Sequence, residues 1–122
     1  MSKSARSVFV FGLYLVALGI VLLVLPNFLL GMFFLPSTTE VWIRVVGMLL
    51  LFLALYYIQA ARKEMTDFFQ WTVYVRATVI LFFTAFVVLG FASPPLVLFG
   101  VVDLLGAIWT GLELRSSKIS VA

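Results

Sequence analysis

Four long runs of apolar residues dominate the chain, and short segments rich in polar residues or proline separate them. The runs cover, to within a few positions, residues 6–25, 41–61, 69–91 and 95–114. Each is close to the ~20 residues that a helix needs to cross the hydrocarbon core of a bilayer. A span in lipid must satisfy its own backbone polar groups, which a helix does and an open strand does not. The pattern therefore predicts an all-α fold, an integral membrane four-helix transmembrane bundle, as a single domain over residues 1–122.

A fifth apolar stretch, residues 27–35, is too short to span a membrane and lies between Pro26 and Pro36. Two interpretations fit it. It is either a short helix lying at the membrane interface or a lid over a cavity between the helices.

The positions of the basic residues predict the orientation of the spans. Lysine and arginine concentrate on the cytoplasmic side of membrane proteins. With four spans, one side holds three basic groups of residues and the other side holds Arg44. The three groups are Lys3 and Arg6, Arg62 and Lys63, and Arg115 and Lys118. We therefore expect a multi-pass protein, of a bacterial inner membrane, with both termini in the cytoplasm (N-in/C-in).

The composition agrees with lipid as the solvent and excludes several chemistries. The chain is 65% hydrophobic and 11% charged, whereas soluble domains carry about 25% charged residues. It contains no cysteine and no histidine. Disulfide chemistry, the usual haem ligand and the usual general base near neutral pH are therefore missing. We expect no enzyme activity, no metal site and no cofactor, and no nucleic-acid partner because the net charge of +3 forms no basic patch.

Small residues recur every seven positions, for example Gly12 and Gly19 in the first span and Gly47 and Ala54 in the second. Small side chains let helices approach closely in lipid, so this spacing predicts a compact bundle. Three threonines in the spans are expected to hydrogen-bond to their own helices. They are Thr78, Thr84 and Thr110.

Asp103 lies near the middle of the last span, where a lone carboxylate costs about 2.5–3.5 kcal/mol. Arg44 and Arg76 are both within reach of it along their helices. The three residues form an interhelical ion pair, a polar spot in a cavity that binds a head group, or a proton or ion relay. Arg44 has Glu40 as an alternative partner and Arg76 has Glu113. Asp103 would then be protonated and would hydrogen-bond across helices.

The inner end of the second span carries a second group of candidates. Tyr56, Tyr57, Gln59 and Arg62 lie there within two helical turns. The group is either a solvated helix end with an aromatic belt or a docking site for a partner or an anionic lipid.

The order of features from Trp42 onward resembles a known group of proteins. Arg44-Val45-Val46-Gly47 opens the second span, Gln70-Trp71-Thr72 opens the third, and Gly90-Phe91-Ala92-Ser93-Pro94-Pro95 leads into the last. This layout is similar to the small four-span proteins of the DoxX-like families and the sterol-biosynthesis scaffold protein of fungi and animals. The resemblance implies an accessory subunit or scaffold of a membrane enzyme, and it transfers no functional residue.

The sequence thus favours a small non-catalytic accessory or scaffold protein that holds a lipid-like, sterol-like or quinone-like molecule between its helices. Its expected partners are membrane lipids and either a membrane enzyme or further copies of itself. The alternative is a small oligomeric transporter or channel with Asp103, Arg44 and Arg76 lining the path.

Overall fold

The computed structural model describes the backbone of residues 1–121 and the side chains of residues 1–116, and over this range the chain is helical with short connections. The elements are α1 (Lys3–Val24), α2 (Pro26–Met32), α3 (Trp42–Arg62), α4 (Thr66–Val88), the 3₁₀ turn η1 (Pro94–Leu96) and α5 (Val97–Val121). Four helical segments are long and apolar enough to cross a membrane: α1, α3, α4 and Pro94–Ser116. The all-α expectation is confirmed.

The third long helix, α4, begins and ends three residues earlier than the sequence predicted. Glu64 has a positive φ of 52° and reverses the chain, and Asp67 in the first turn favours a helix start because carboxylates are stabilised near a helix N-terminus. At the other end Gly90 has a φ of 81°. Phe91 N–H donates to the carbonyl of Phe86 at 2.8 Å. This left-handed cap ends the helix before the apolar run ends.

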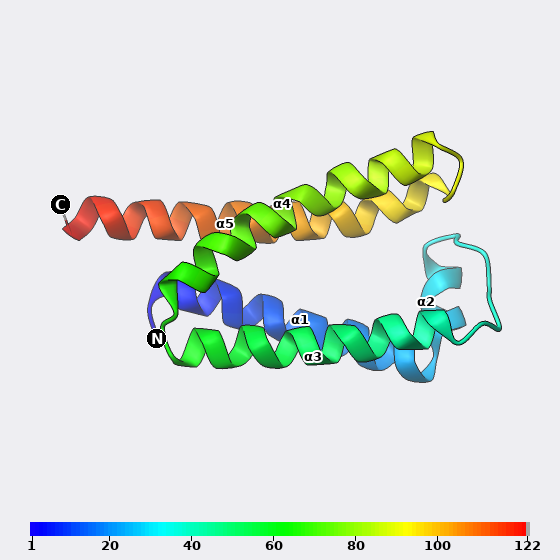
Figure 1. Ribbon diagram of the computed structural model, residues 1–122, viewed down its shortest axis with the longest axis horizontal. Coiled ribbons are helices and arrows are strands. Elements are labelled where there is room, and N and C mark those ends of the chain that lie inside the picture. Colours follow the sequence, from blue (N-terminus) through cyan, green and yellow to red (C-terminus); the bar gives the residue numbers. More distant parts are fainter. Residues whose placement is uncertain (122) are drawn as a thin grey trace.

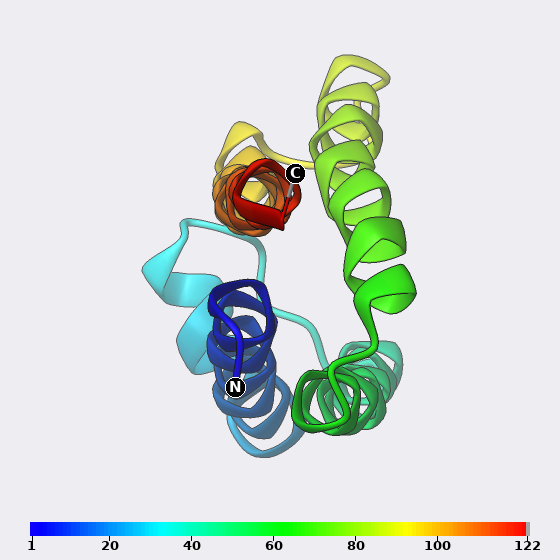
Figure 2. The ribbon, with the colours of Figure 1, turned by 90° about the vertical axis from the view of Figure 1, so that its left-hand side faces the viewer.

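The long helices form two antiparallel hairpins. Helix α1 packs along α3, and α4 packs along α5. Contact between α1 and α5 joins the hairpins, whereas α3 and α4 touch little beyond the turn that connects them (Figures 1 and 2). The bundle is therefore less uniformly packed than the spacing of small residues predicted.

Glycines set the closest helix contacts. A Cβ added to Gly19 would lie 2.9 Å from the carbonyl oxygen of Gly47, and one added to Gly47 would lie 2.8 Å from that of Gly19. A Cβ on Gly100 would lie 2.8 Å from the Cα of Ile80. The backbones of α1 and α3, and those of α4 and α5, approach so closely because these positions carry no side chain.

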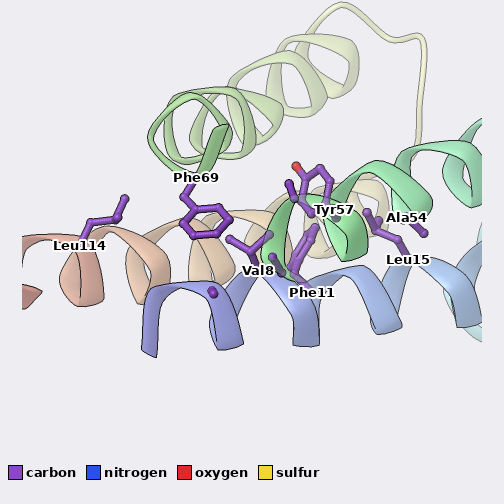
Figure 3. Close-up of a cluster of buried hydrophobic side chains, with 10 residues drawn as sticks. Val8, Phe11, Leu15, Ala54, Tyr57, Phe69 and Leu114 are labelled. Carbon is purple, nitrogen blue, oxygen red and sulfur yellow. The ribbon is translucent and has the colours of Figure 1, made fainter. Parts of the chain in front are cut away.

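The hydrophobic core, whose side chains are drawn in Figure 3, lies in the half of the bundle that contains the N-terminus and the α3–α4 turn (Figure 1). Helix α1 supplies Ala5, Val8, Phe11 and Leu15, and α3 supplies Ala54, Tyr57, Ala60 and Ala61; Phe69 of α4 and Leu114 of α5 complete it. We call this half the inner half, and the half that contains α2 and η1 the outer half.

Candidate functional site

Arg76 of α4 is buried among the helices of the inner half, with 2% of its surface exposed. Its Nη2 donates hydrogen bonds to Thr110 Oγ1 at 2.8 Å and to Thr72 Oγ1 at 3.1 Å. Its Nε donates to the carbonyl oxygen of Thr72 at 3.3 Å. Thr72 lies one turn before Arg76 on α4, and Thr110 lies opposite it on α5. The arginine therefore links α4 to α5.

A serine extends these contacts to α1. The hydroxyls of Ser7 and Thr110 are 2.7 Å apart, and Ser7 Oγ donates to the carbonyl oxygen of Ser4 at 2.7 Å. Because Ser7 donates its one hydroxyl hydrogen to Ser4, Thr110 Oγ1 donates to Ser7 Oγ while it accepts from Arg76 Nη2. We call Ser7, Thr72, Arg76 and Thr110 the arginine cluster; it joins α1, α4 and α5 where the hairpins meet.

Aromatic rings cover the remaining face of the guanidinium. Arg76 Cζ lies 4.7 Å from the ring centroid of Phe11 and 5.8 Å from that of Tyr57, which are cation–π distances. Its Nη1 is buried without a hydrogen-bond partner among the described residues. A Cβ on Gly106 would lie 3.1 Å from this nitrogen, so the absent side chain at Gly106 provides room for the arginine.

A cavity of about 210 Å³ occupies the centre of the outer half. Its walls are mainly apolar and come from every helix: examples are Leu18 of α1, Leu30 of α2, Ile43 of α3, Phe83 of α4 and Phe99 of α5. The cavity is partly open.

Two polar side chains, Tyr14 of α1 and Asp103 of α5, also line this cavity. Asp103 is half-buried and stands one turn before Gly106, the residue that makes room for Arg76. Within residues 1–116 neither the Tyr14 hydroxyl nor the Asp103 carboxylate has a hydrogen-bond partner from the protein. The cavity therefore has an apolar body and a polar floor, and the arginine cluster lies behind the floor.

Helix α2 forms the outer end of the cavity. Leu29 and Leu30 line it from above, while Phe28 and Met32 are exposed on the opposite side of the short helix. The short helix thus places Leu29 and Leu30 over the cavity, and the location of residues 27–35 at a membrane interface stays a prediction. Phe33, which follows α2, packs on Phe99 with ring centroids 4.5 Å apart.

The loop after α2 is fixed by an asparagine. Asn27 Nδ2 donates to the carbonyl oxygen of Thr38 at 3.0 Å, and the backbone N–H of Thr38 donates to Asn27 Oδ1 at 2.8 Å. These two bonds hold the start of α2, which covers the cavity, against the loop that precedes α3.

Arg44 lies apart from Asp103. It is exposed at the outer end of α3, and its Nη1 donates to the carbonyl oxygens of Leu23 and, at 3.4 Å, Val24. These are among the last carbonyls of α1, which have no partner within the helix. Arg44 thus caps α1, and neither it nor Arg76 hydrogen-bonds to Asp103, Glu40 or Glu113 among the described side chains.

The four candidate docking residues do not share one surface. Tyr56, Gln59 and Arg62 are exposed, whereas Tyr57 has 3% of its surface exposed. Tyr57 packs edge-on against Phe68, with ring centroids 5.5 Å apart. Successive helical residues differ by about 100° in direction, so the adjacent side chains of Tyr56 and Tyr57 lie in different environments. Tyr57 belongs to the core.

Sequence reasoning missed Tyr14, Ser7 and Thr72, and it misjudged Thr110. Thr78 donates to the carbonyl oxygen of Tyr74 in its own helix, as expected. Thr110 instead bonds to Arg76 and Ser7 across helices. The spacing of the two threonines could have indicated their role. Thr72 lies four residues before Arg76, and Thr110 lies seven residues after Asp103, so each threonine shares a helix face with a charged residue.

The turn between α3 and α4 carries a separate polar contact, with the start of α1. Ser2 donates to Glu64 twice, from its backbone N–H at 2.6 Å and from its Oγ at 2.7 Å. These two hydrogen bonds hold the pKa of Glu64 below its ordinary value of 4.5, and the bond from the Ser2 side chain has the larger effect. Both residues are exposed, so this contact ties the N-terminus to the turn without forming a site.

Comparisons with protein families, with characterised proteins and with solved structures gave no match to this chain.

Proposed function

We propose that this chain is a four-span membrane protein that holds a small hydrophobic molecule among its helices and acts as a non-catalytic accessory or scaffold protein. The observation that carries the proposal is the cavity of about 210 Å³, with apolar walls and a floor of Tyr14 and Asp103. Its molecule would be lipid-like, and its host would be a membrane enzyme or a homo-oligomer in the same bilayer.

The outer surface supports a location in lipid. Large apolar side chains are exposed on every long helix: Leu13 is 48% exposed, Phe52 53%, Leu81 67% and Leu105 60%. Soluble monomers rarely expose contiguous apolar surface of this extent. The N-terminus and the α3–α4 turn, with Lys3, Arg62 and Lys63 beside them, lie at the same end of the bundle (Figure 1). This end is cytoplasmic by the positive-inside rule.

The orientation has a direct test because the chain has no cysteine. Single thiols are placed at the two ends of the bundle, as Ser37→Cys and Lys63→Cys, and intact cells are treated with a membrane-impermeant maleimide. The proposed topology predicts labelling of the first variant alone, and of the second only after the cells are permeabilised. Labelling of the second alone would reverse the orientation, and equal labelling of both would contradict a single orientation.

The size of the cavity bounds what it holds. An engineered apolar cavity of about 150 Å³ is large enough to take up benzene. A cavity of about 210 Å³ accepts a ring with a short chain, or a chain segment of similar volume. A whole phospholipid does not fit, so a longer molecule would extend out of the cavity, which is partly open, into the bilayer.

The arrangement gives less support to the transporter alternative. Arg44 is engaged with carbonyls at the outer end of α1, and Arg76 is enclosed by two threonines and two aromatic rings. A transport path needs these charges to face a shared aqueous space. Flux of ions or drugs through purified protein in liposomes, lost on Asp103→Asn, would favour transport.

Native mass spectrometry of the protein extracted in mild detergent tests the binding proposal. Leu18 lines the cavity, whereas Leu13 lies on the exposed face of the same helix. We expect the wild-type protein and the Leu13→Phe control to retain a molecule of defined mass. Leu18→Phe fills the cavity and is expected to lose that molecule. Spectra without a bound molecule, or the same molecule in all three proteins, would contradict the proposal.

A further inference from the structure

The polar floor of the cavity restricts the chemistry of what binds there. Asp103 and Tyr14 both face the cavity, and within the described side chains neither has a partner from the protein. Both side chains are half-buried, and polar groups withdrawn from water are nearly always hydrogen-bonded. In a bilayer core, with an apolar space in front of them, a bound molecule is the partner available to both.

The charge of Arg76 determines the state of Asp103 that the ligand meets. A guanidinium stays protonated in proteins, and a buried charge in a membrane is tolerated when an opposite charge balances it. Asp103 is the acidic residue that lines the cavity. It stands one turn from Gly106, where the unpartnered Nη1 of Arg76 lies. An ionised Asp103 makes the interior neutral, and Arg76 donates its hydrogen bonds to Thr72 and Thr110 rather than to Asp103.

An ionised carboxylate only accepts hydrogen bonds, whereas a tyrosine hydroxyl both donates and accepts. The O–H hydrogen of Tyr14 needs an acceptor and the carboxylate of Asp103 needs a donor, so a ligand that satisfies both donates to Asp103 and accepts from Tyr14. An ether or a quinone carbonyl only accepts, so it leaves the carboxylate without a partner. An ammonium only donates, and it would add a charge to an interior that Asp103 and Arg76 already balance. A hydroxyl group donates one hydrogen bond and accepts another without changing the charge.

We infer that the ligand is an alcohol: a hydrocarbon with one hydroxyl group, which donates to Asp103 and accepts from Tyr14. The hydrocarbon lies along Leu18 and Ile43 toward α2, in the part of the cavity that has apolar walls. This inference rests on the proposed function, because it names the class of molecule that the same cavity takes.

Photolabelling measures this preference. The full-length protein is placed in lipid nanodiscs with a decanol that carries a diazirine on its chain. Unlabelled competitors are 1-decanol, its methyl ether 1-methoxydecane, and decylamine, each compared at equal mole fraction in the lipid. We expect saturable labelling, and we expect 1-decanol to displace the probe at a mole fraction at least about tenfold lower than the ether. Sites built to bond a hydroxyl discriminate strongly against analogues that lack one.

Each competing result has a distinct meaning. Equal displacement by the alcohol and the ether would overturn the hydroxyl requirement and leave the hydrophobic cavity standing. Stronger displacement by decylamine would replace the alcohol with a cationic ligand. Labelling that no competitor reduces would overturn the proposed function itself, because the cavity would then bind none of these chains.

Two substitutions on α5 provide matched variants. Asp103→Asn puts an N–H donor on the floor of the cavity, so the preference for 1-decanol over the ether should fall to about threefold or less. Glu113→Gln makes the same chemical change on the same helix outside the cavity lining, and the preference should stay as in the wild type. The preference is a ratio within one sample, so partial misfolding of a variant does not alter it. An unchanged ratio in Asp103→Asn would overturn the role of Asp103.

Discussion

Replacing Thr110 with valine removes the hydroxyl at the centre of the arginine cluster while keeping the branched shape of the side chain. Thr110 Oγ1 lies 2.8 Å from Arg76 Nη2 and 2.7 Å from Ser7 Oγ. A hydrogen bond to a charged group contributes about 1.5–3 kcal/mol, and interhelical bonds between neutral groups in membranes average about 0.6 kcal/mol. Arg76 Nη2 keeps its bond to Thr72, which reduces the loss. We therefore expect Thr110→Val to lower the free energy of unfolding by about 2 kcal/mol.

The assay is reversible unfolding in mixed micelles of a mild detergent and dodecyl sulfate, followed by circular dichroism. Thr78→Val serves as the control. Thr78 is exposed, and its hydroxyl bonds to the carbonyl oxygen of Tyr74 in its own helix, so its loss should cost less than about 0.5 kcal/mol. The reasoning would be refuted if the two valine variants had the same stability, because the interhelical bonds of Thr110 would then contribute nothing.

Two further predictions concern stability. Gly47→Ala should destabilise the protein by about 1–3 kcal/mol in thermal unfolding, because the new Cβ would lie 2.8 Å from the backbone of Gly19. Gly31→Ala has open space and should not destabilise, so similar losses in both would contradict close α1–α3 packing. Glu64→Gln should cost a few tenths of a kcal/mol near neutral pH, since both partners are exposed. Because the contact with Ser2 lowers the pKa of Glu64, the difference should vanish as the pH falls below 4.5 through that lowered pKa. A difference that grows on acidification would have the wrong sign.

The four long helices were predictable because hydrophobic length alone defines them. The ends of α4 were not, because apolar residues continue through the turn at Gly90. Hydropathy does not distinguish the last turn of a helix from an apolar loop. The close contact of α1 with α3 was also predictable, since Gly19 and Gly47 lie in long apolar runs and glycine lets two helices approach closely. The weak contact between α3 and α4 was not predictable, because no single residue in the sequence indicates it.

The site was predictable in its charged residues and not in their partners. Asp103 and Arg76 stand out as charges inside apolar runs. A helix face contains several polar candidates, however, and which helix lies opposite depends on the connection of the hairpins. Arg76 therefore meets Thr110 and Phe11, contacts that join segments far apart in the chain. Nothing in the sequence distinguishes Tyr14 from the other aromatic residues of the long apolar runs, and only the cavity that it lines does so.

The most direct test of the account is a set of intermolecular nuclear Overhauser effects between protonated 1-decanol and methyl-labelled protein in perdeuterated micelles. We expect saturable effects at the methyl groups of Leu18, Leu30 and Ile43, which line the cavity. Exposed Leu13 and Leu55 should show weak effects that rise in proportion to the decanol. Effects confined to these exposed leucines, with none at the cavity methyl groups, would show that the cavity holds no ligand and would contradict the central claim.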